Sequence, residues 1–202
     1  MAAPDALQPS TRINLERATV LVLDDNGASL EILSQVVSGF GVSALLRAES
    51  VAEAQRIVQN KTLDLIISDV QMPEVDGCEF IQWLRREGGE ANRYVPVILV
   101  TGHTRASQIL KIRDAGANFT VAKPITPKVL LERIYWVARE DRVFIECDSF
   151  VGPDRRFKHT GPPPGTDGRR RDDLPAEVGL AVEANMSQEE INSLMKPAKV
   201  SV

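Results

Sequence analysis

The sequence DLIISDVQMPEVDG, at residues 64–77, carries the pattern that decides the fold of this chain. Its first five residues predict a short β-strand, because a continuous apolar run is typical of a strand covered on both faces of a parallel sheet. An acidic residue, Asp69, follows directly at the end of this strand. The loop that comes next ends at Gly77, which permits tight backbone geometry before a helix predicted at residues 78–86.

The same alternation of strand and helix extends on both sides of this segment. The other predicted strands are residues 19–23, 42–46, 97–100 and 119–122, and the other helices are residues 29–40, 51–60, 106–115 and 127–139. We therefore expect an α/β domain at residues 18–140, with a five-stranded parallel sheet and five helices. Right-handed crossovers would gather the carboxyl ends of the strands at one edge of the sheet, where such folds bind ligands.

Chemically distinctive side chains follow four of these strands. Asp24 and Asp25 follow the first strand, Asp69 the third, Thr101 the fourth and Lys123 the fifth. Carboxylates crowded at one edge repel each other, and a divalent cation would relieve that repulsion. The hard oxygen donors of Asp24, Asp25 and Asp69 favour Mg²⁺ over Zn²⁺.

Asp69 is the candidate nucleophile at this edge, because a carboxylate can attack phosphorus and form an acyl phosphate. Lys123 supplies a cation for the transferred oxygens, and its bond to Pro124 can adopt the cis isomer. The hydroxyl of Thr101 can donate a hydrogen bond to a phosphoryl oxygen. Because that bond would exist only in the phosphorylated protein, it could turn phosphorylation into a conformational signal.

Four segments, LVLDDN, SDVQMPEVDG, LVTG and VAKP, occur in an order and spacing that resemble the receiver domain of two-component response regulators, especially the single-domain chemotaxis type. The resemblance covers residues 18–140 and implies a flavodoxin-like fold, phosphorylation of Asp69, and Mg²⁺ bound with help from the backbone carbonyl of Gln71. It also implies a signalling protein rather than an enzyme, with a sensor histidine kinase or a histidine phosphotransfer protein as phosphoryl donor. By the same resemblance, Gln71 and His103 would tune the phosphoryl lifetime. Thr120 stands where the family often has Tyr or Phe.

Each of these residues also has an ordinary structural explanation. Asp25 can cap a helix, Thr101 suits a β position and Lys123 can be a solvated strand end. Their joint placement at one sheet edge favours the functional interpretation. An enzymatic alternative is a phosphatase of the haloacid dehalogenase class, but its Asp-x-Asp signature does not fit the adjacent Asp24 and Asp25.

Composition limits the classes of partner. The formal net charge is -4 and the pI is about 5.3, which argues against a surface committed to nucleic acid or to an anionic membrane. No apolar run approaches the roughly 20 residues that a membrane helix needs. Residues 1–17 look like a flexible leader without the apolar core of a signal peptide, so we expect a cytoplasmic protein. Cys78 and Cys147 are expected to be reduced thiols.

Beyond residue 140 the alternation of strand and helix fades, and residues 141–185 look like an extension with a Pro/Gly/Arg-rich linker. The run VFIEC, at residues 143–147, can form a short edge strand or pack on the receiver. Basic side chains gather further on, at Arg155, Arg156, Lys158, Arg169, Arg170 and Arg171. A solvated linker explains them, but they leave open an alternative function, a phosphorylation-independent adaptor or second-messenger binder that acts through this basic tail.

A short amphipathic helix is predicted at residues 186–196. Ser187 and Glu190 match a capping box, and Met186 is spaced from Ile191 as a hydrophobic staple. Together with Ile191, the side chains of Leu194 and Met195 would form a small apolar face. An isolated helix of this length is not stable in water, so this face needs a surface to dock on.

Read as a string, SQEEINSLM resembles the short segment of flagellar motor switch proteins that chemotaxis response regulators bind. The resemblance implies that this helix docks on the receiver of its own chain or on that of another response regulator, and that it mimics or competes with the motor segment. A capped C-terminal helix without a special purpose is the alternative. The resulting functional prediction is a phosphorelay response regulator that signals through protein binding, with a role in chemotaxis or motility.

Overall fold

A computed structural model of the chain describes residues 14–139, 143–148, 150–154 and 185–195. Its centre is a parallel sheet of five strands in the order β2-β1-β3-β4-β5. The strands are β1 (Thr19–Leu23), β2 (Ala44–Ala48), β3 (Leu65–Asp69), β4 (Val97–Thr101) and β5 (Phe119–Ala122). The predicted α/β class and five-stranded parallel sheet are confirmed.

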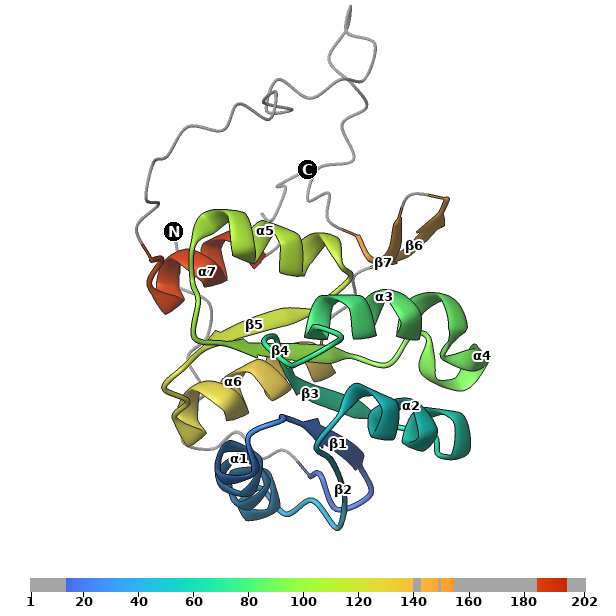
Figure 1. Cartoon of the computed structure of the whole chain (residues 1–202). Helices are drawn as coiled ribbons and strands as arrows, with labels where there is room; N and C mark the ends of the chain where they lie inside the picture. The colour runs from blue at the N-terminus through green and yellow to red at the C-terminus, as the bar shows by residue number, and fades with distance from the viewer. Residues whose placement is uncertain (1–13, 140–142, 149, 155–184, 196–202) are drawn as a thin grey trace, which may run out of the picture.

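Helices cover both faces of this sheet, with α1 and α6 on one side and α2, α3 and α5 on the other (Figure 1). Their bounds are α1 (Gly27–Gly39), α2 (Val51–Asn60), α3 (Gly77–Glu87), α5 (Ala106–Asp114) and α6 (Pro127–Ala138). An additional helix, α4 (Gly89–Asn92), was not predicted, because four residues are too few to show helical periodicity.

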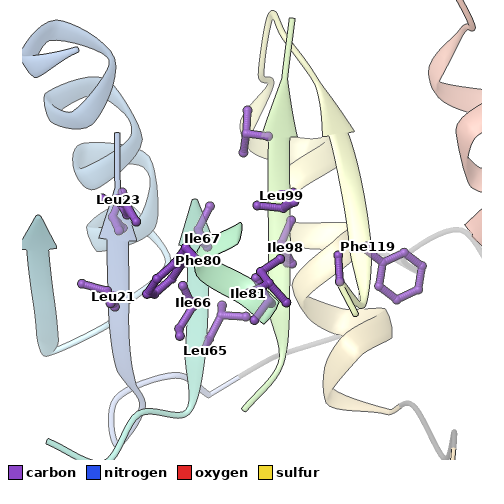
Figure 2. Packing of buried hydrophobic residues seen from close by; sticks show 14 of the residues in the cluster. Leu21, Leu23, Leu65, Ile66, Ile67, Phe80, Ile81, Ile98, Leu99 and Phe119 are labelled. Carbon is purple, nitrogen blue, oxygen red and sulfur yellow. The ribbon is translucent and has the colours of Figure 1, made fainter. Parts of the chain in front are cut away.

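The core lies around the two central strands, β3 and β4, in which every residue is buried. Figure 2 shows Leu65, Ile66 and Ile67 of β3 close to Phe80 and Ile81 of α3. Full burial of each such side chain contributes about 1.5–3 kcal/mol to folding. These strands are therefore a rigid base for the residues that follow their carboxyl ends.

Local signals explain where the helices begin. Asp76 caps α3 through a capping box, in which its side chain accepts from the backbone N–H of Glu79 and the Glu79 side chain accepts from the N–H of Asp76. Asn26, Ser50 and Thr126 cap α1, α2 and α6 in the same way with single side-chain bonds. The helices that flank the candidate site thus have fixed starting points.

Strand β2 begins two residues later than predicted. The sequence favoured residues 42–46, but pairing with β1 aligns Thr19 with Ala44 and Leu23 with Ala48. The end of the strand was missed because Arg47 is charged and interrupts the apolar run. Its side chain is exposed and forms an ion pair with Glu31 at 2.8 Å. An exposed arginine can continue an edge strand, so the apolar run marked this strand two residues too early.

Two further elements pack on the α/β domain. Strands β6 (Phe144–Cys147) and β7 (Phe150–Pro153) form an antiparallel hairpin that is separate from the main sheet. The short strand expected within residues 143–147 is confirmed as β6, which pairs with β7 and not with the main sheet. The hairpin also packs on the α/β domain, where Phe144 contacts Tyr94 and Arg85. Helix α7 (Gln188–Met195) lies beside α5, away from the hairpin (Figure 1). In the described part of the chain, no helix has the length and apolar character required to span a membrane.

Candidate functional site

Three of the side chains singled out in the sequence meet at the carboxyl edge of the sheet. The ammonium of Lys123, just after β5, lies 2.6 Å from Oδ1 of Asp69 at the end of β3. It also lies 3.2 Å from Oδ2 of Asp24, just after β1. The lysine therefore reaches across the end of β4 and bridges two carboxylates. The Lys123–Pro124 bond, for which the sequence allowed the cis isomer, is cis.

Both carboxylates are buried, with Asp24 only 2% and Asp69 only 5% exposed. Burial raises the pKa of Asp69 most strongly, Lys123 lowers it, and the negative charge of Asp24 raises it again, so the net pKa lies above the ordinary value. For Lys123, burial lowers the pKa, but the hydrogen bond and charge of Asp69 outweigh burial and raise it. One ammonium faces two carboxylates, which leaves an excess of negative charge.

This donor set suits a hard divalent cation. Asp24 and Asp69 offer carboxylate oxygens in a buried, negatively charged place, and the exposed Asp25 follows Asp24 directly. Gln71 lies close as well, because its backbone N–H donates to Oδ2 of Asp69 at 2.7 Å. Among the described residues, no three His, Cys, Asp or Glu side chains are gathered around one point in a way that could hold a metal. The fit to Mg²⁺ therefore depends on donor chemistry and charge.

Thr101 lies at the same edge, but its hydroxyl bonds within the following loop. Thr101 is fully buried at the end of β4, which pairs with β3 and with β5. Its Oγ1 accepts from the backbone N–H of His103 at 3.0 Å and donates to the carbonyl of His103 at 3.1 Å. The side chain is thus near the candidate site and already has partners in the loop that leads to α5.

Close contact with the backbone of Asp69 requires a glycine at position 77. A Cβ added to Gly77 would lie 2.3 Å from the carbonyl oxygen of Asp69, a distance that real side chains do not show. The Gly77 N–H also donates to the carbonyl of Val70 at 2.9 Å. The prediction of tight backbone geometry at Gly77 is confirmed, and the contact fixes the start of α3 against the end of β3.

Helix α7 docks on the α/β domain of its own chain. Ile191 is fully buried and Met195 is 1% exposed, and both belong to the hydrophobic core cluster. The predicted capping box is confirmed, since the Ser187 N–H donates to Glu190 at 2.7 Å and the Glu190 N–H donates to Oγ of Ser187 at 3.3 Å. The side chain of Leu194, the third predicted member of the apolar face, lies outside the described residues.

Sequence reasoning missed Gln188, which provides polar contacts between α7 and β5. Its Oε1 accepts from the backbone N–H of Ala122 at 2.6 Å, and its Nε2 donates to the carbonyl of Thr120 at 3.1 Å. β5 is the last strand of the sheet, so one of its sides has no neighbouring strand. A side-chain amide can donate and accept there as a peptide group does. Nothing in the sequence pairs Gln188 with a strand 66 residues away.

The structure describes one of the two cysteines as a buried thiol, and it does not describe the basic residues of the tail. Cys78 is buried, and burial raises its pKa to about 12, as expected of an unreactive thiol. The six basic residues of the tail, on which the adaptor or second-messenger interpretation depends, lie outside the described part of the chain.

Comparison with known proteins agrees with this fold. Residues 20–135 match the model of the response regulator receiver domain. The chain is 30% identical over 116 residues to the polar-differentiation response regulator DivK of Brucella ovis, covering 57% of this chain and 92% of DivK. The chemotaxis response regulator CheY4 of Vibrio cholerae superposes with a TM-score of 0.55 and 28% identity, covering 59% of this chain and 98% of CheY4.

A third relative is the receiver domain of the histidine kinase CKI1 from Arabidopsis thaliana, whose structure is a complex with Mg²⁺ and BeF3-. Its TM-score is 0.54 at 26% identity, with 62% of this chain and 93% of that chain covered. The family match spans more than half of the sequence and coincides with the five-stranded sheet. This chain therefore belongs to the response regulator receiver domain family.

Proposed function

We propose that the chain is a phosphorylation-dependent response regulator that accepts a phosphoryl group on Asp69. Receiver domains are signalling modules that interact with histidine kinases or histidine phosphotransfer proteins, and we assign a partner of that kind as the donor. The observation that carries the proposal is the ion pair between Asp69 and Lys123 at 2.6 Å, inside a buried acidic site at the sheet edge. The output is a change in protein binding rather than turnover of a substrate.

Each residue of the site has its own role in phosphoryl transfer. A carboxylate oxygen of Asp69 attacks phosphorus, and the bond between phosphorus and the donor breaks. Lys123 is already within bonding distance of Asp69, so its ammonium can follow the negative charge to a phosphoryl oxygen. The N–H of Gln71 holds the other carboxylate oxygen and so orients the nucleophile.

We further propose that Asp24, Asp25 and Asp69, with the backbone carbonyl of Gln71, hold Mg²⁺. When bound, the ion neutralises negative charge on the carboxylates and on the phosphoryl oxygens. The excess of negative charge around Lys123 supports this assignment, as does the Mg²⁺ complex of the related CKI1 receiver.

A role in chemotaxis or motility is the more specific part of the proposal. It is supported by the similarity to a chemotaxis response regulator and by the likeness of SQEEINSLM to the motor switch segment. Helix α7 docks on β5 of its own chain, which favours docking within the chain. In that position α7 would compete with a motor segment or with another response regulator for the same face.

The test is phosphorylation with a small phosphodonor and Mg²⁺, followed by intact mass measurement. Wild type should gain one phosphoryl group, and Asp69→Ala should gain none. Asp64→Ala is a matched control, because Asp64 lies on the amino side of β3, where its side chain accepts from the N–H of Thr19. An unmodified wild type, under conditions that phosphorylate another receiver, would refute the proposal.

A further inference from the structure

One strand edge of the hairpin β6–β7 has no neighbouring strand. β7 pairs with β6 on one side and meets the α/β domain on the other, where a Cβ on Gly116 would lie 2.8 Å from the carbonyl of Val151. Among the described residues, β6 pairs with β7 alone, and the hairpin stands apart from the main sheet (Figure 1). The outer edge of β6 is therefore open to a further strand.

The pairing with β7 determines which backbone groups of β6 face this open edge. The N–H of Asp154 donates to the carbonyl of Val143 at 2.8 Å, so these two residues are a hydrogen-bonded pair of the antiparallel ladder. Hydrogen-bonded and non-hydrogen-bonded pairs alternate along such a ladder. The N–H and C=O groups of Phe144 and Glu146 therefore point away from β7, and no hydrogen bond to them occurs within the described part of the chain. Phe144 accordingly faces Pro153, which has no N–H to donate.

The charge on β6 does not protect this edge from pairing. Proteins commonly protect an edge strand with lysine, with proline or with an unpaired charge. The sequence of β6, FIEC, contains one charged residue, Glu146, and its carboxylate lies 2.6 Å from the guanidinium of Arg93 in the same chain. The outer edge of β6 therefore carries no uncompensated charge that would repel another strand.

One face of β6 is apolar. Side chains alternate along a strand, so Val143, Ile145 and Cys147 lie on the face opposite to Glu146. Val143 is 64% exposed, Cys147 is exposed and Ile145 is half-buried. An open edge beside an exposed apolar face is typical of a site for strand addition.

A second copy of the same strand is complementary to this edge. In an antiparallel pair with a twofold axis at Ile145, Phe144 of each copy faces Glu146 of the other, and each such pair exchanges both of its hydrogen bonds. Ile145 then faces Ile145 of the second copy, and Val143 faces Cys147. An axis at Glu146 would instead place two carboxylates opposite each other, which is unfavourable.

We propose that the outer edge of β6 is a docking surface for a second copy of this chain, and that the two hairpins join into one continuous antiparallel sheet with its twofold axis at Ile145. This inference goes beyond the proposed function and does not depend on it. The hairpin lies beside Gly116, which precedes β5, whereas Asp69 is the last residue of β3. The contact is thus at the end of the domain opposite to the candidate site, and association should not require phosphorylation.

Val143→Cys in the full chain tests the register. In the proposed sheet, position 143 and Cys147 of the second copy form a non-hydrogen-bonded pair with Cα atoms about 4.5 Å apart, which is within reach of a disulfide. Within one chain the same positions lie about 13 Å apart along the strand. Mild oxidation should therefore give a covalent dimer, and peptide mass spectrometry should find position 143 joined to Cys147.

Two controls accompany this variant. Wild type should give no covalent dimer, because the two Cys147 residues would lie about 13 Å apart in the proposed register. Val143→Cys combined with Cys147→Ser should give none either, because position 143 then has no thiol opposite it. A dimer joined through position 143 of both copies would overturn the register.

Sedimentation velocity over a range of concentrations gives a second, independent readout. The contact is small, so the dimer should be weak and should appear as a rise in mean mass with concentration. Ile145→Lys places two ammonium groups opposite each other and should weaken association by at least about tenfold. Ile32→Lys, at a position of α1 that is 64% exposed, adds the same charge elsewhere and should associate as wild type. Hydrogen exchange of the dilute Ile145→Lys protein verifies that its hairpin is folded.

The outcomes distinguish the possible occupants of the edge. A disulfide between positions 143 and 147, together with association that Ile145→Lys weakens, supports the inference. A wild type that stays monomeric at every concentration, with no covalent dimer of Val143→Cys, would leave the edge to a strand of a different protein and overturn it. Association that survives Ile145→Lys but is lost in Ile191→Asp would assign the contact to α7 and overturn it as well. Asp69→Ala should associate as wild type.

Discussion

The hairpin β6–β7 and the helix α7 both follow the receiver in sequence and pack on it, but they contact opposite ends of the same strands. The hairpin lies against Gly116, which precedes β5, and against Arg85 of α3. Residues 185–188 contact the loop after β4 and the end of β5. Since the candidate site is at the carboxyl ends, only α7 is placed to respond to it. The hairpin is placed to stabilise the fold.

The contacts of the two elements differ in kind. A Cβ on Gly116 would lie 2.8 Å from the carbonyl of Val151, and one on Gly152 would lie 2.8 Å from Cα of Gly116, so two backbones meet without side chains between them. Helix α7 instead rests on two buried apolar side chains and a few hydrogen bonds. Close backbone packing tolerates little movement. Opening of α7 would remove these two side chains from the edge of the core cluster and leave the sheet intact.

The largest effect should come from the arginine under the hairpin. Arg85 is fully buried and donates to four acceptors, the carbonyls of Arg93, Val95 and Gly116 and the side chain of Asn118. Arg85→Met removes all of these bonds, although Asn118 keeps the bond that its Oδ1 accepts from the N–H of Val97. The change should lower the free energy of unfolding by about 3–5 kcal/mol, measured by denaturant titration. Arg86→Met, at an exposed neighbour, should cost no more than about 0.5 kcal/mol. Similar values for both variants would contradict a stabilising role for this contact.

Gly116→Ala should have the next largest effect. The φ angle of Gly116 is +100°, and the added methyl group would meet β7, so a loss of about 2–3 kcal/mol in unfolding free energy is expected. Exchange should accelerate in residues 144–153 and remain unchanged in residues 186–195. Gly39→Ala, which meets nothing within 4 Å, is the control and should be neutral or stabilising. Equal acceleration in both segments would mean that the hairpin and α7 are not independent.

Ile191→Asp should have a smaller effect on global stability, about 1–2 kcal/mol, because it removes only the docking of a short, separately opening segment. The same change should abolish exchange protection in residues 186–195. Denaturant titration and hydrogen exchange on one preparation provide both values. A loss as large as that of Arg85→Met would show that α7 is an integral part of the core.

Asp69→Asn should raise the free energy of unfolding. The expected gain is smaller in size than the loss expected from Ile191→Asp. The folded-state pKa of Asp69 is raised, mainly by burial, so ionisation of this carboxyl costs folding free energy at pH above that pKa. As the pH falls through the raised pKa, wild type takes up the proton and the difference between the two proteins should shrink. Denaturant titrations across this pH range test the sign. A gain that grows toward low pH would contradict the assignment.

The smallest effect is expected from Glu146→Gln. Arg93 contacts Glu146 of β6 at 2.6 Å, but the carboxylate side chain is exposed. Solvent screens such pairs, so the expected loss is about 0.5 kcal/mol or less, measured by denaturant titration at low and high salt. A larger loss would mean that charge, rather than backbone packing, holds the hairpin on the receiver.

Features that depend on a local pattern of residues could be predicted from the sequence. Features that depend on contacts between residues distant in the chain could not. Periodicity placed β1, α2 and β5 with their observed bounds, and the rule that parallel strands align their carboxyl ends brought Asp24, Asp69 and Lys123 together. The capping box predicted α7 for the same local reason.

Other features had no local signal. The bond between Gln188 and β5 joins residues 66 apart, and the contact between Gly116 and Gly152 depends on the path of the hairpin. Helix α4 was too short to show a period. The engagement of Thr101 with His103 could not be anticipated either, because its hydroxyl was expected to face a phosphoryl group.

The most direct test of the central claim is to locate the phosphorylated residue. After treatment with a phosphodonor and Mg²⁺, borohydride reduces an acyl phosphate to an alcohol, and peptide mass spectrometry then identifies the altered side chain. The account predicts one altered residue, Asp69, on the peptide that contains β3. Alteration at Asp24, at Asp25 or at any residue outside the sheet edge would contradict it.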